Sequence, residues 1–533
     1  MKTNTLLPVL LLITGAILLC SLLTYPLGHD QALFNVGGKM IYNDFAVPYR
    51  DFLDMKPPGV FYVYALTNLI SDNYTFNVRF FDLLYHVVCL SILYIFLNKE
   101  SASKIFATLS IFIYIVLYVS IGFWNTSGAE SFSLLPSLLM FIVTFRYVVT
   151  SEVSSQKILC YSLIIGVCIF ALFLFKFTFS LLVIASFASV LLFSDTTLIK
   201  KTATIIGAVV VFILCGIAYY AYLDVQGATV NLLLTLEWLP KYTSTTQANT
   251  IGSLMTFLYK DVPVTLTTTL SPVFVIILIL NAKAIFFPRM ESQSRSNIDV
   301  LISKILVIFC CLSLFSVLIE RKLFVYHYSR IFWIVAPLIS MWLLEHIEKF
   351  YQLLKSLRKS IGVLFVALFL FYSPIPRLLY HSFRLVYCSL FEGKAAINII
   401  LAGDGYDIYS AGQVSLRLKP LMEGNDKKTV FIWGNIVELY SMLNQLPPTF
   451  CITNPQFISP WTPPQWKEQL LKQLNERKPD FFVVEHNDAR KSITGSSLDS
   501  YASLKEWEGL SSYLETNYHR IDSNRSFLVY GHN

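Results

Sequence analysis

Apolar runs of about 20 residues recur along the first two thirds of the chain, and they constrain its fold more than any other feature. A helix of that length spans the hydrocarbon core of a bilayer. The chain is also 55% hydrophobic and only 14% charged, which is outside the usual range of soluble globular domains. The sequence therefore predicts an all-α membrane protein with about 11 transmembrane helices. The expected spans are residues 6–25, 80–97, 105–121, 131–149, 158–175, 177–194, 203–222, 262–280, 300–319, 328–345 and 361–376.

The composition changes abruptly after the last apolar run. This change divides the chain into a membrane domain at 1–376, a linker at 377–392 and a soluble domain at 393–533. The last part has mixed charge and Pro-rich turns, and its length of about 140 residues is enough for independent folding. We expect a small α/β domain, in which no residue is singled out as catalytic. Its expected elements are strands at 428–433, 480–484 and 526–530 and an amphipathic helix at 465–476.

Lys and Arg in the short loops predict the orientation of the chain, because cytoplasmic loops are enriched in basic residues. One alternating set of loops carries most of these basic residues and is expected to be cytoplasmic. With an odd number of spans, the N-terminus is then cytoplasmic and the C-terminal domain is periplasmic or extracellular. This plasma (inner) membrane topology explains the net charge of +7, and no basic amphipathic stretch or zinc pattern indicates a nucleic-acid partner. The basic set is Lys2, Lys99, Lys104, Lys157, Lys200, Lys201, Lys283, Arg289, Arg295, Lys349, Lys355, Arg358 and Lys359.

The first outer loop concentrates charged residues directly after the first span. Its segment 28–59 reads GHDQALFNVGGKMIYNDFAVPYRDFLDMKPPG. Transfer of a sugar from a lipid phosphate needs a carboxylate that accepts a proton and cations that hold the departing phosphate. The loop offers both kinds of group. Pro57 and Pro58 are expected to hold Lys56 in a defined extended turn.

The same loop resembles the GT-C superfamily of membrane glycosyltransferases. An acid just after the first span, YRDF at 49–52 and DMKPPG at 54–59 are similar to glycosyltransferase family 39, which includes protein O-mannosyltransferases and the aminoarabinose transferase acting on lipid A. The resemblance implies that Asp30 is the catalytic base and that Lys56 lies by the donor phosphate. Many relatives carry two adjacent acids in this loop, whereas here Asp30 is followed by Gln31.

The resemblance extends to two later outer loops. NTSGAESF at 125–132 places Glu130 where the family often carries an acid, which implies a second catalytic acid. VYHYSR at 325–330 is similar to an HY element of the family, which implies that His327 lies near the lipid phosphate. The other residues that we expect to bind substrate are Tyr328, Arg330, Arg50, Asp51 and Asp54.

The fold expected from these features is a polytopic GT-C-like helical bundle with a small non-cytoplasmic α/β domain. The stretches 31–41 and 60–70 are too short to span and are expected to form interfacial helices. No cofactor is indicated with certainty, and a divalent metal is possible. Its candidate ligands would be Asp30 with His327 or Glu130, although the chain lacks the closely spaced oxygen ligands of a dedicated Mg²⁺ or Ca²⁺ site.

Each candidate residue also has a structural interpretation. Asp30 fits the N-cap of a helix that begins at Gln31, and Lys56 fits an interfacial lysine that reaches lipid head groups. Glu130 fits a charge favoured at a helix N-terminus. Arg50, Asp51 and Asp54 fit salt bridges that shape the loop, and His327 fits an ordinary interfacial histidine. Ionisable residues in or near spans are functional candidates by default; they are Asp82, His86 and Lys176.

The sequence thus predicts an inverting glycosyltransferase that uses a polyprenyl-phosphate-linked sugar donor. Its expected partners are that donor, the membrane lipid, and an acceptor hydroxyl on a lipid, glycan or protein. A lipid-linked glycan flippase or transporter is the competing class, and it predicts charged residues along a path through the bilayer. A polysaccharide ligase or polymerase, and a membrane anchor for the C-terminal domain as a binding module, remain further alternatives.

Overall fold

The computed structural model describes residues 6–244 apart from 72, residues 297–356 apart from 323, and residues 408–533 apart from 423–427, with a few positions between 380 and 391. The chain divides into two compact units. The first comprises Met1–Tyr25, Arg79–Ile217 and Leu254–Tyr387, and the second comprises Pro26–Val78, Ala218–Ser253 and Cys388–Asn533. The second unit therefore combines the loop between α1 (Leu6–Cys20) and α4 (Tyr74–Ser101), called the first loop, with the C-terminal segment.

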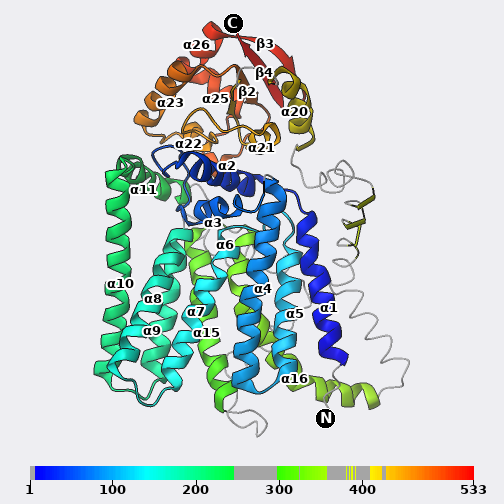
Figure 1. The fold of residues 1–533 in the computed structure, drawn as a ribbon, viewed down its shortest axis with the longest axis vertical. Coiled ribbons are helices and arrows are strands. Elements are labelled where there is room, and N and C mark those ends of the chain that lie inside the picture. The colour runs from blue at the N-terminus through cyan, green and yellow to red at the C-terminus, as the bar shows by residue number, and fades with distance from the viewer. Residues whose placement is uncertain are drawn as a thin grey trace. The chain divides into compact units, whose positions relative to one another are not determined.

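The first unit is a bundle of long apolar helices that run side by side (Figure 1). Within the described residues, 7 helices are long and apolar enough to cross a membrane, and two shorter apolar helices accompany them. These nine match predicted spans, while the predicted spans 262–280 and 361–376 lie outside the described residues. The nine described spans are built from ten α-helices, of which α6 and α7 together form one span: α1 (Leu6–Cys20), α4 (Tyr74–Ser101), α5 (Lys104–Ser120), α6 (Ala129–Phe132), α7 (Leu134–Val149), α8 (Ser155–Phe175), α9 (Leu182–Phe193), α10 (Leu198–Val225), α15 (Asn297–Glu320) and α16 (Phe332–Ser356).

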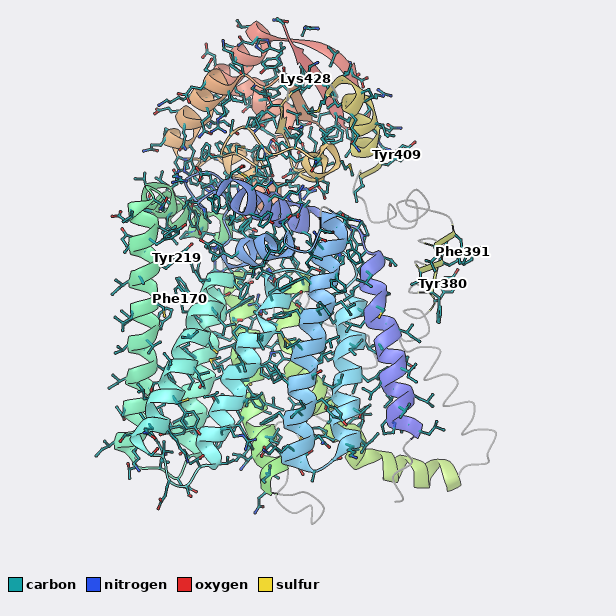
Figure 2. The ribbon with its side chains drawn as sticks, in the orientation of Figure 1. Phe170, Tyr219, Tyr380, Phe391, Tyr409 and Lys428 are labelled. Atoms are coloured by element: carbon teal, nitrogen blue, oxygen red, sulfur yellow. The ribbon has the colours of Figure 1, made fainter. Side chains whose placement is uncertain are left out.

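Local signals explain where several of these helices start and which side chains they expose. The hydroxyl of Ser103 accepts the Phe106 N–H at the start of α5, and that of Ser154 accepts the Lys157 N–H at the start of α8. In α10, only 11% of the most apolar window is buried inside the protein. A helix that exposes this much apolar side chain is stable when lipid covers it. Phe170 on α8 is labelled in Figure 2, where its side chain is drawn as sticks.

The second unit contains a four-stranded sheet with the order β1-β2-β4-β3. β1 (Val430–Trp433) pairs in parallel with β2 (Phe481–Glu485), and β4 (Phe527–His532) lies antiparallel to β2. These are the three predicted strands, and the predicted helix is α23 (Pro464–Arg477). The edge strand β3 (Tyr518–Ser523) was not predicted, because its residues YHRIDS are mostly polar and exposed. The other helices are α2 (His29–Asp44), α3 (Gly59–Thr67), α11 (Thr229–Ser244), α20 (Ile408–Met422), α21 (Glu438–Leu443), α22 (Pro455–Ile458), α24 (Lys491–Thr494), α25 (Ser500–Glu506) and α26 (Glu508–Asn517).

The first loop is part of the hydrophobic core of this unit. Tyr49 and Leu53 pack in one buried cluster with Trp238 of α11 and with Phe431 and Trp466 of the C-terminal segment. Backbone hydrogen bonds join the same parts, since the Leu53 N–H donates to the Phe450 carbonyl over 2.9 Å. The loop is thus held by long-range contacts, and the sequence boundaries separate segments that fold together.

Three further hydrogen bonds hold the end of α10 and helix α11 within this unit. The hydroxyl of Tyr219, labelled in Figure 2, lies 3.0 Å from the hydroxyl of Tyr62 on α3. Asn231 on α11 donates its side-chain amide to the Tyr49 carbonyl over 2.8 Å and accepts the indole N–H of Trp466 over 3.1 Å. Asn231 therefore connects the first loop to α23.

Helices α2 and α3 match the predicted interfacial stretches 31–41 and 60–70, and they cross at two glycines. A Cβ atom added at Gly37 would lie 2.5 Å from the Phe61 ring, and one at Gly38 would lie 2.8 Å from the backbone nitrogen of Ala65. The backbone at Ala65 cannot move aside as a flexible side chain would. Glycine at these positions is therefore what allows the close approach of the two helices.

We expect Gly38→Ala to destabilise the second unit by about 1–3 kcal/mol, because the new methyl group overpacks the crossing of α2 and α3. Gly412→Ala in α20 is the matched control, since a Cβ atom there meets no atom within 4 Å; in a helix this change is neutral or stabilising by up to about 1 kcal/mol. Thermal melting of both variants in detergent measures the difference. Equal melting temperatures would contradict the close crossing.

Candidate active site

Asp30 and Lys56 form an ion pair at the start of α2. The Lys56 Nζ atom lies 2.8 Å from Asp30 Oδ2, and the two side chains are 21% and 31% exposed. The ammonium of Lys56 also lies 4.5 Å from the centroid of the Phe34 ring, a cation–π contact that fixes its direction. The N-cap of α2 is Gly28, and Asp30 is in the first turn. The N-cap interpretation of Asp30 is therefore wrong, because the helix begins two residues before Gln31.

Asp54 lies beside this pair and is buried, with 4% of the residue exposed. Its Oδ1 atom accepts the backbone N–H of Met55 over 2.6 Å. Burial raises the pKa of Asp54 to about 6, and Lys56 partly offsets that effect while Asp30 adds to it. Asp54 therefore belongs to one group of charged side chains with Asp30 and Lys56. Because its pKa is about 6, little free energy is needed to protonate its carboxylate near neutral pH.

Arg50 and Asp51 pair with each other, with Arg50 Nη2 2.7 Å from Asp51 Oδ2. Asp51 Oδ2 also accepts the backbone N–H of Val47 over 2.7 Å, and Arg50 Nη1 donates to the side-chain oxygen of Gln226 over 3.0 Å. The hydrogen bond to Asp51 raises the pKa of Arg50. These contacts fit the structural interpretation, in which the pair shapes the loop between α2 and α3.

The C-terminal segment contributes charged groups to the same region. Burial lowers the pKa of His29 to about 3, and Arg490 lowers it further while Asp30 raises it. Glu438, the first residue of α21, is buried, and burial raises its pKa to about 8; Asp30 raises it further and Arg490 lowers it. Neither carboxyl oxygen of Glu438 has a hydrogen-bond partner in another described residue. Glu438 and Arg490 were not predicted as site residues, and the only signal in the sequence is the acid inside the apolar stretch FIWGNIVELY.

A second charge cluster lies within the first unit and consists of Glu130, Lys176, Glu320, His327 and Arg330. Lys176 Nζ is 3.0 Å from Glu130 Oε1 and 2.7 Å from Glu320 Oε2. Arg330 contacts the same two acids at 3.2 and 2.8 Å, and His327 Nδ1 lies 3.1 Å from Glu320 Oε2. Two carboxylates thus balance two cations, which is the condition under which buried charges are tolerated.

The sequence predicted three members of this first-unit charge cluster, Glu130, His327 and Arg330. It also predicted their neighbour Tyr328. Tyr328 is buried, and its hydroxyl has no hydrogen-bond partner among the described residues. Lys176 was a candidate only as an ionisable residue near a span. Glu320 was missed, because an acid at the end of an apolar run followed by Arg321 and Lys322 looks like an ordinary helix end. His327 is buried rather than exposed at an interface.

A buried network holds the loop that carries Glu130. Arg79 donates to the hydroxyls of Thr126 and Ser127 over 2.9 and 2.7 Å. Asp82 accepts from the hydroxyls of Ser127 and Tyr118 over 3.0 and 2.8 Å. Ser127 has a positive φ of 59°, a conformation that a non-glycine residue adopts only when its surroundings impose it. Asp82 therefore orients this loop.

No group of three or more His, Cys, Asp or Glu side chains that could hold a metal ion occurs among the described residues. The candidate ligands named from the sequence belong to different units: Asp30 to the second, and Glu130 and His327 to the first.

Replacing Glu438 by Gln should change how stability depends on pH. The pKa of Glu438 is about 8 in the folded chain, compared with about 4.3 in an unfolded chain. Between these values the unfolded chain releases a proton that the folded chain keeps, so native stability falls as the pH rises from about 5 to 8. Glu438→Gln cannot ionise, so its melting temperature relative to the wild type should increase across this range.

The matched control for this titration is Glu476→Gln, since the Glu476 side chain is 59% exposed. Its melting temperature should differ from that of the wild type by an amount that does not change with pH. If Glu438→Gln behaves in the same way, Glu438 does not titrate near pH 8.

No family model matches the chain, and no curated protein matches it. The chain is similar in structure to ArnT from Cupriavidus metallidurans bound to undecaprenyl phosphate, with a TM-score of 0.59 and 10% identity over 99% of this chain and 98% of that chain. It is also similar to the archaeal oligosaccharyltransferase AglB from Archaeoglobus fulgidus, in complex with an inhibitory peptide and a dolichol-phosphate, with a TM-score of 0.45 and 11% identity over 100% of this chain and 75% of that chain. The similarity to the ArnT structure and the apolar helices together show a multi-pass membrane protein with a GT-C-type fold.

Proposed function

We propose that this chain is an integral membrane glycosyltransferase that transfers a sugar from a polyprenyl-phosphate donor to an acceptor hydroxyl. The observation that carries this proposal is the ion pair of Asp30 and Lys56, with 2.8 Å between the charged atoms. Both side chains are partly exposed, so a substrate can reach them. The GT-C-type fold supports the proposal, because the similar ArnT structure contains undecaprenyl phosphate.

In the proposed reaction, Asp30 accepts the proton of the acceptor hydroxyl. A carboxylate in an ion pair is ionised, which is the form that can act as a general base. The acceptor oxygen then attacks the anomeric carbon while the bond from that carbon to the phosphate oxygen breaks. A single displacement of this kind inverts the anomeric configuration, and the bonding electrons leave with the phosphate.

Lys56 is proposed to stabilise the negative charge that develops on the departing phosphate. A well-placed donor of this kind contributes about 3 kcal/mol to transition-state stabilisation. Asp54 is proposed to contact the substrate next to Lys56, and Arg50 and Asp51 to hold the loop in shape and bind substrate at its edge. The acceptor is a lipid, a glycan or a protein.

For the first-unit charge cluster we propose roles in catalysis for Glu130 and in substrate binding for His327, Tyr328 and Arg330. Because the charges of this cluster are buried and balanced, replacing a single member should lower the stability of the folded chain considerably. Removing one partner of a buried ion pair typically costs about 3–5 kcal/mol. A loss of activity there has to be separated from a loss of folding by a melting measurement.

Asp30→Asn should lower turnover by about a hundredfold or more, because the variant has no general base. Asp44→Asn is the matched control, since Asp44 is an exposed acid at the other end of α2, and it should leave turnover unchanged. The assay is release of polyprenyl phosphate from a labelled polyprenyl-phosphate sugar by purified protein. Near-normal transfer by Asp30→Asn would refute the base assignment, and transbilayer movement of intact donor without release would favour a flippase.

We also propose that the N-terminus is cytoplasmic and that the C-terminal segment is on the outer face, as the basic loops indicate. A reporter phosphatase that is active only outside the cytoplasm should be active when fused after Asn533. The same reporter fused after Ser101, in a short basic loop, should be inactive. The opposite pattern would place Asp30 inside and would contradict the proposed outer active site.

A further inference from the structure

Glu130 lies on α6, a helix of only four residues. A single helical turn gains few hydrogen bonds for the backbone freedom that it loses, so a helix this short does not hold its own position. The loop before α6 includes Ser127, whose φ of 59° is imposed by its surroundings. The direction of the Glu130 carboxylate therefore depends on the contacts that other helices make with this loop and with α6.

Tyr118, in the last turn of α5, makes three such contacts through its hydroxyl. The hydroxyl accepts the backbone N–H of Ser127 over 3.0 Å and donates to Asp82 Oδ2 over 2.8 Å. It also lies 2.9 Å from the hydroxyl of Ser131 in α6. Ser131 in turn accepts the Gly128 N–H over 3.2 Å at the start of α6. One phenolic oxygen thus joins α4, the loop before α6, and α6 itself.

The phenol ring of Tyr118 is itself held in place. Tyr118 is fully buried, and its ring stacks on the imidazole of His86 with 4.1 Å between the ring centroids. Nδ1 of His86 lies 2.9 Å from the backbone carbonyl of Asp82, and Nε2 lies 3.0 Å from the hydroxyl of Tyr114. His86 is thereby fixed at both ring nitrogens, and it provides a fixed surface against which the Tyr118 ring packs.

The position of α6 determines which groups the Glu130 carboxylate meets. Glu130 Oε1 lies 3.0 Å from Lys176 Nζ and 3.2 Å from Arg330 Nη2. A displacement of α6 by about 1 Å away from these cations would take both distances beyond the range of an ordinary hydrogen bond. Misplacing a reacting group by about 1 Å can lower a rate about a hundredfold. Contacts that hold α6 can therefore control turnover without touching the substrate.

We propose that Tyr118 is a positioning residue for Glu130, because its hydroxyl holds α6 in the place where the Glu130 carboxylate keeps its direction. This inference rests on the proposed catalytic role of Glu130. Tyr118 acts through Ser127 and Ser131, and its phenol exchanges no proton with the substrate. Removing the hydroxyl should therefore slow the chemical step, while binding of the donor stays unchanged.

The test compares Tyr118→Phe with Tyr147→Phe in the purified full chain. Both replacements delete one buried phenolic hydroxyl, since Tyr147 on α7 is fully buried and its hydroxyl lies 3.3 Å from Thr196 Oγ1. Both variants should therefore melt at a lower temperature than the wild type. Tyr118→Phe should lower kcat for release of polyprenyl phosphate about 10- to 100-fold, with an unchanged KM for the labelled donor. Tyr147→Phe should keep the wild-type kcat.

Ser131→Ala tests the same contact from its other side, and it keeps the test decisive if Tyr118→Phe does not fold. This variant should also lower kcat with an unchanged KM. Because Tyr118 and Ser131 act through one shared contact, the loss of kcat in the double variant should be smaller than the product of the two single losses. Losses that multiply would show that the two residues act independently, and they would overturn the inference.

A wild-type kcat in Tyr118→Phe, or an equal loss of kcat in Tyr147→Phe, would also overturn the positioning role. Glu130→Gln separates this inference from the proposed function. If Glu130→Gln is inactive while Tyr118→Phe and Ser131→Ala turn over normally, the positioning role alone fails. If Glu130→Gln turns over as the wild type does, the proposed catalytic role of Glu130 is contradicted, and the positioning role fails with it.

Discussion

Placing a lysine beside an aspartate at the start of α2 requires more than the first loop can provide. The loop contains only two short helices, and its apolar side chains Val47, Tyr49 and Leu53 are buried against residues of α11 and of the C-terminal segment. Burial of such side chains stabilises the loop by about 1.5–3 kcal/mol each. The geometry of the charged pair therefore depends on hydrophobic contacts with parts of the chain that are distant in sequence.

The parts of the fold that were predictable from the sequence are those that depend on local patterns. Membrane helices follow from the length of apolar runs, and β1, β2 and β4 follow from short apolar stretches. β3 was missed because an exposed edge strand such as Tyr518–Ser523 has little apolar signal. The packing of the first loop against the C-terminal segment was also not predicted. The hydrophobic pattern of a sequence indicates local structure, but it does not indicate which distant segments share a core.

The candidate site likewise contains residues that a local sequence pattern indicates and residues that only long-range contacts bring together. Asp30 and Lys56 were identified because they are close in sequence and match a known motif, and the structure brings them into contact. Glu320, Glu438 and Arg490 were not identified, since each becomes notable only through neighbours that folding brings to it. Glu438 is the clearest case, because its buried carboxyl lowers stability near neutral pH only through the surroundings that folding gives it.

The contact between Asn35 and Ser441 joins residues that are 406 positions apart, and this separation has a consequence for biosynthesis. At synthesis rates of roughly 5–20 residues per second, the first loop emerges roughly 20–80 s before its partner exists. During that interval Val47, Tyr49 and Leu53 have no core to enter, so the nascent loop has to be sheltered by lipid or by a chaperone. Maturation of this chain would then be limited by the arrival of its last segment rather than by membrane insertion.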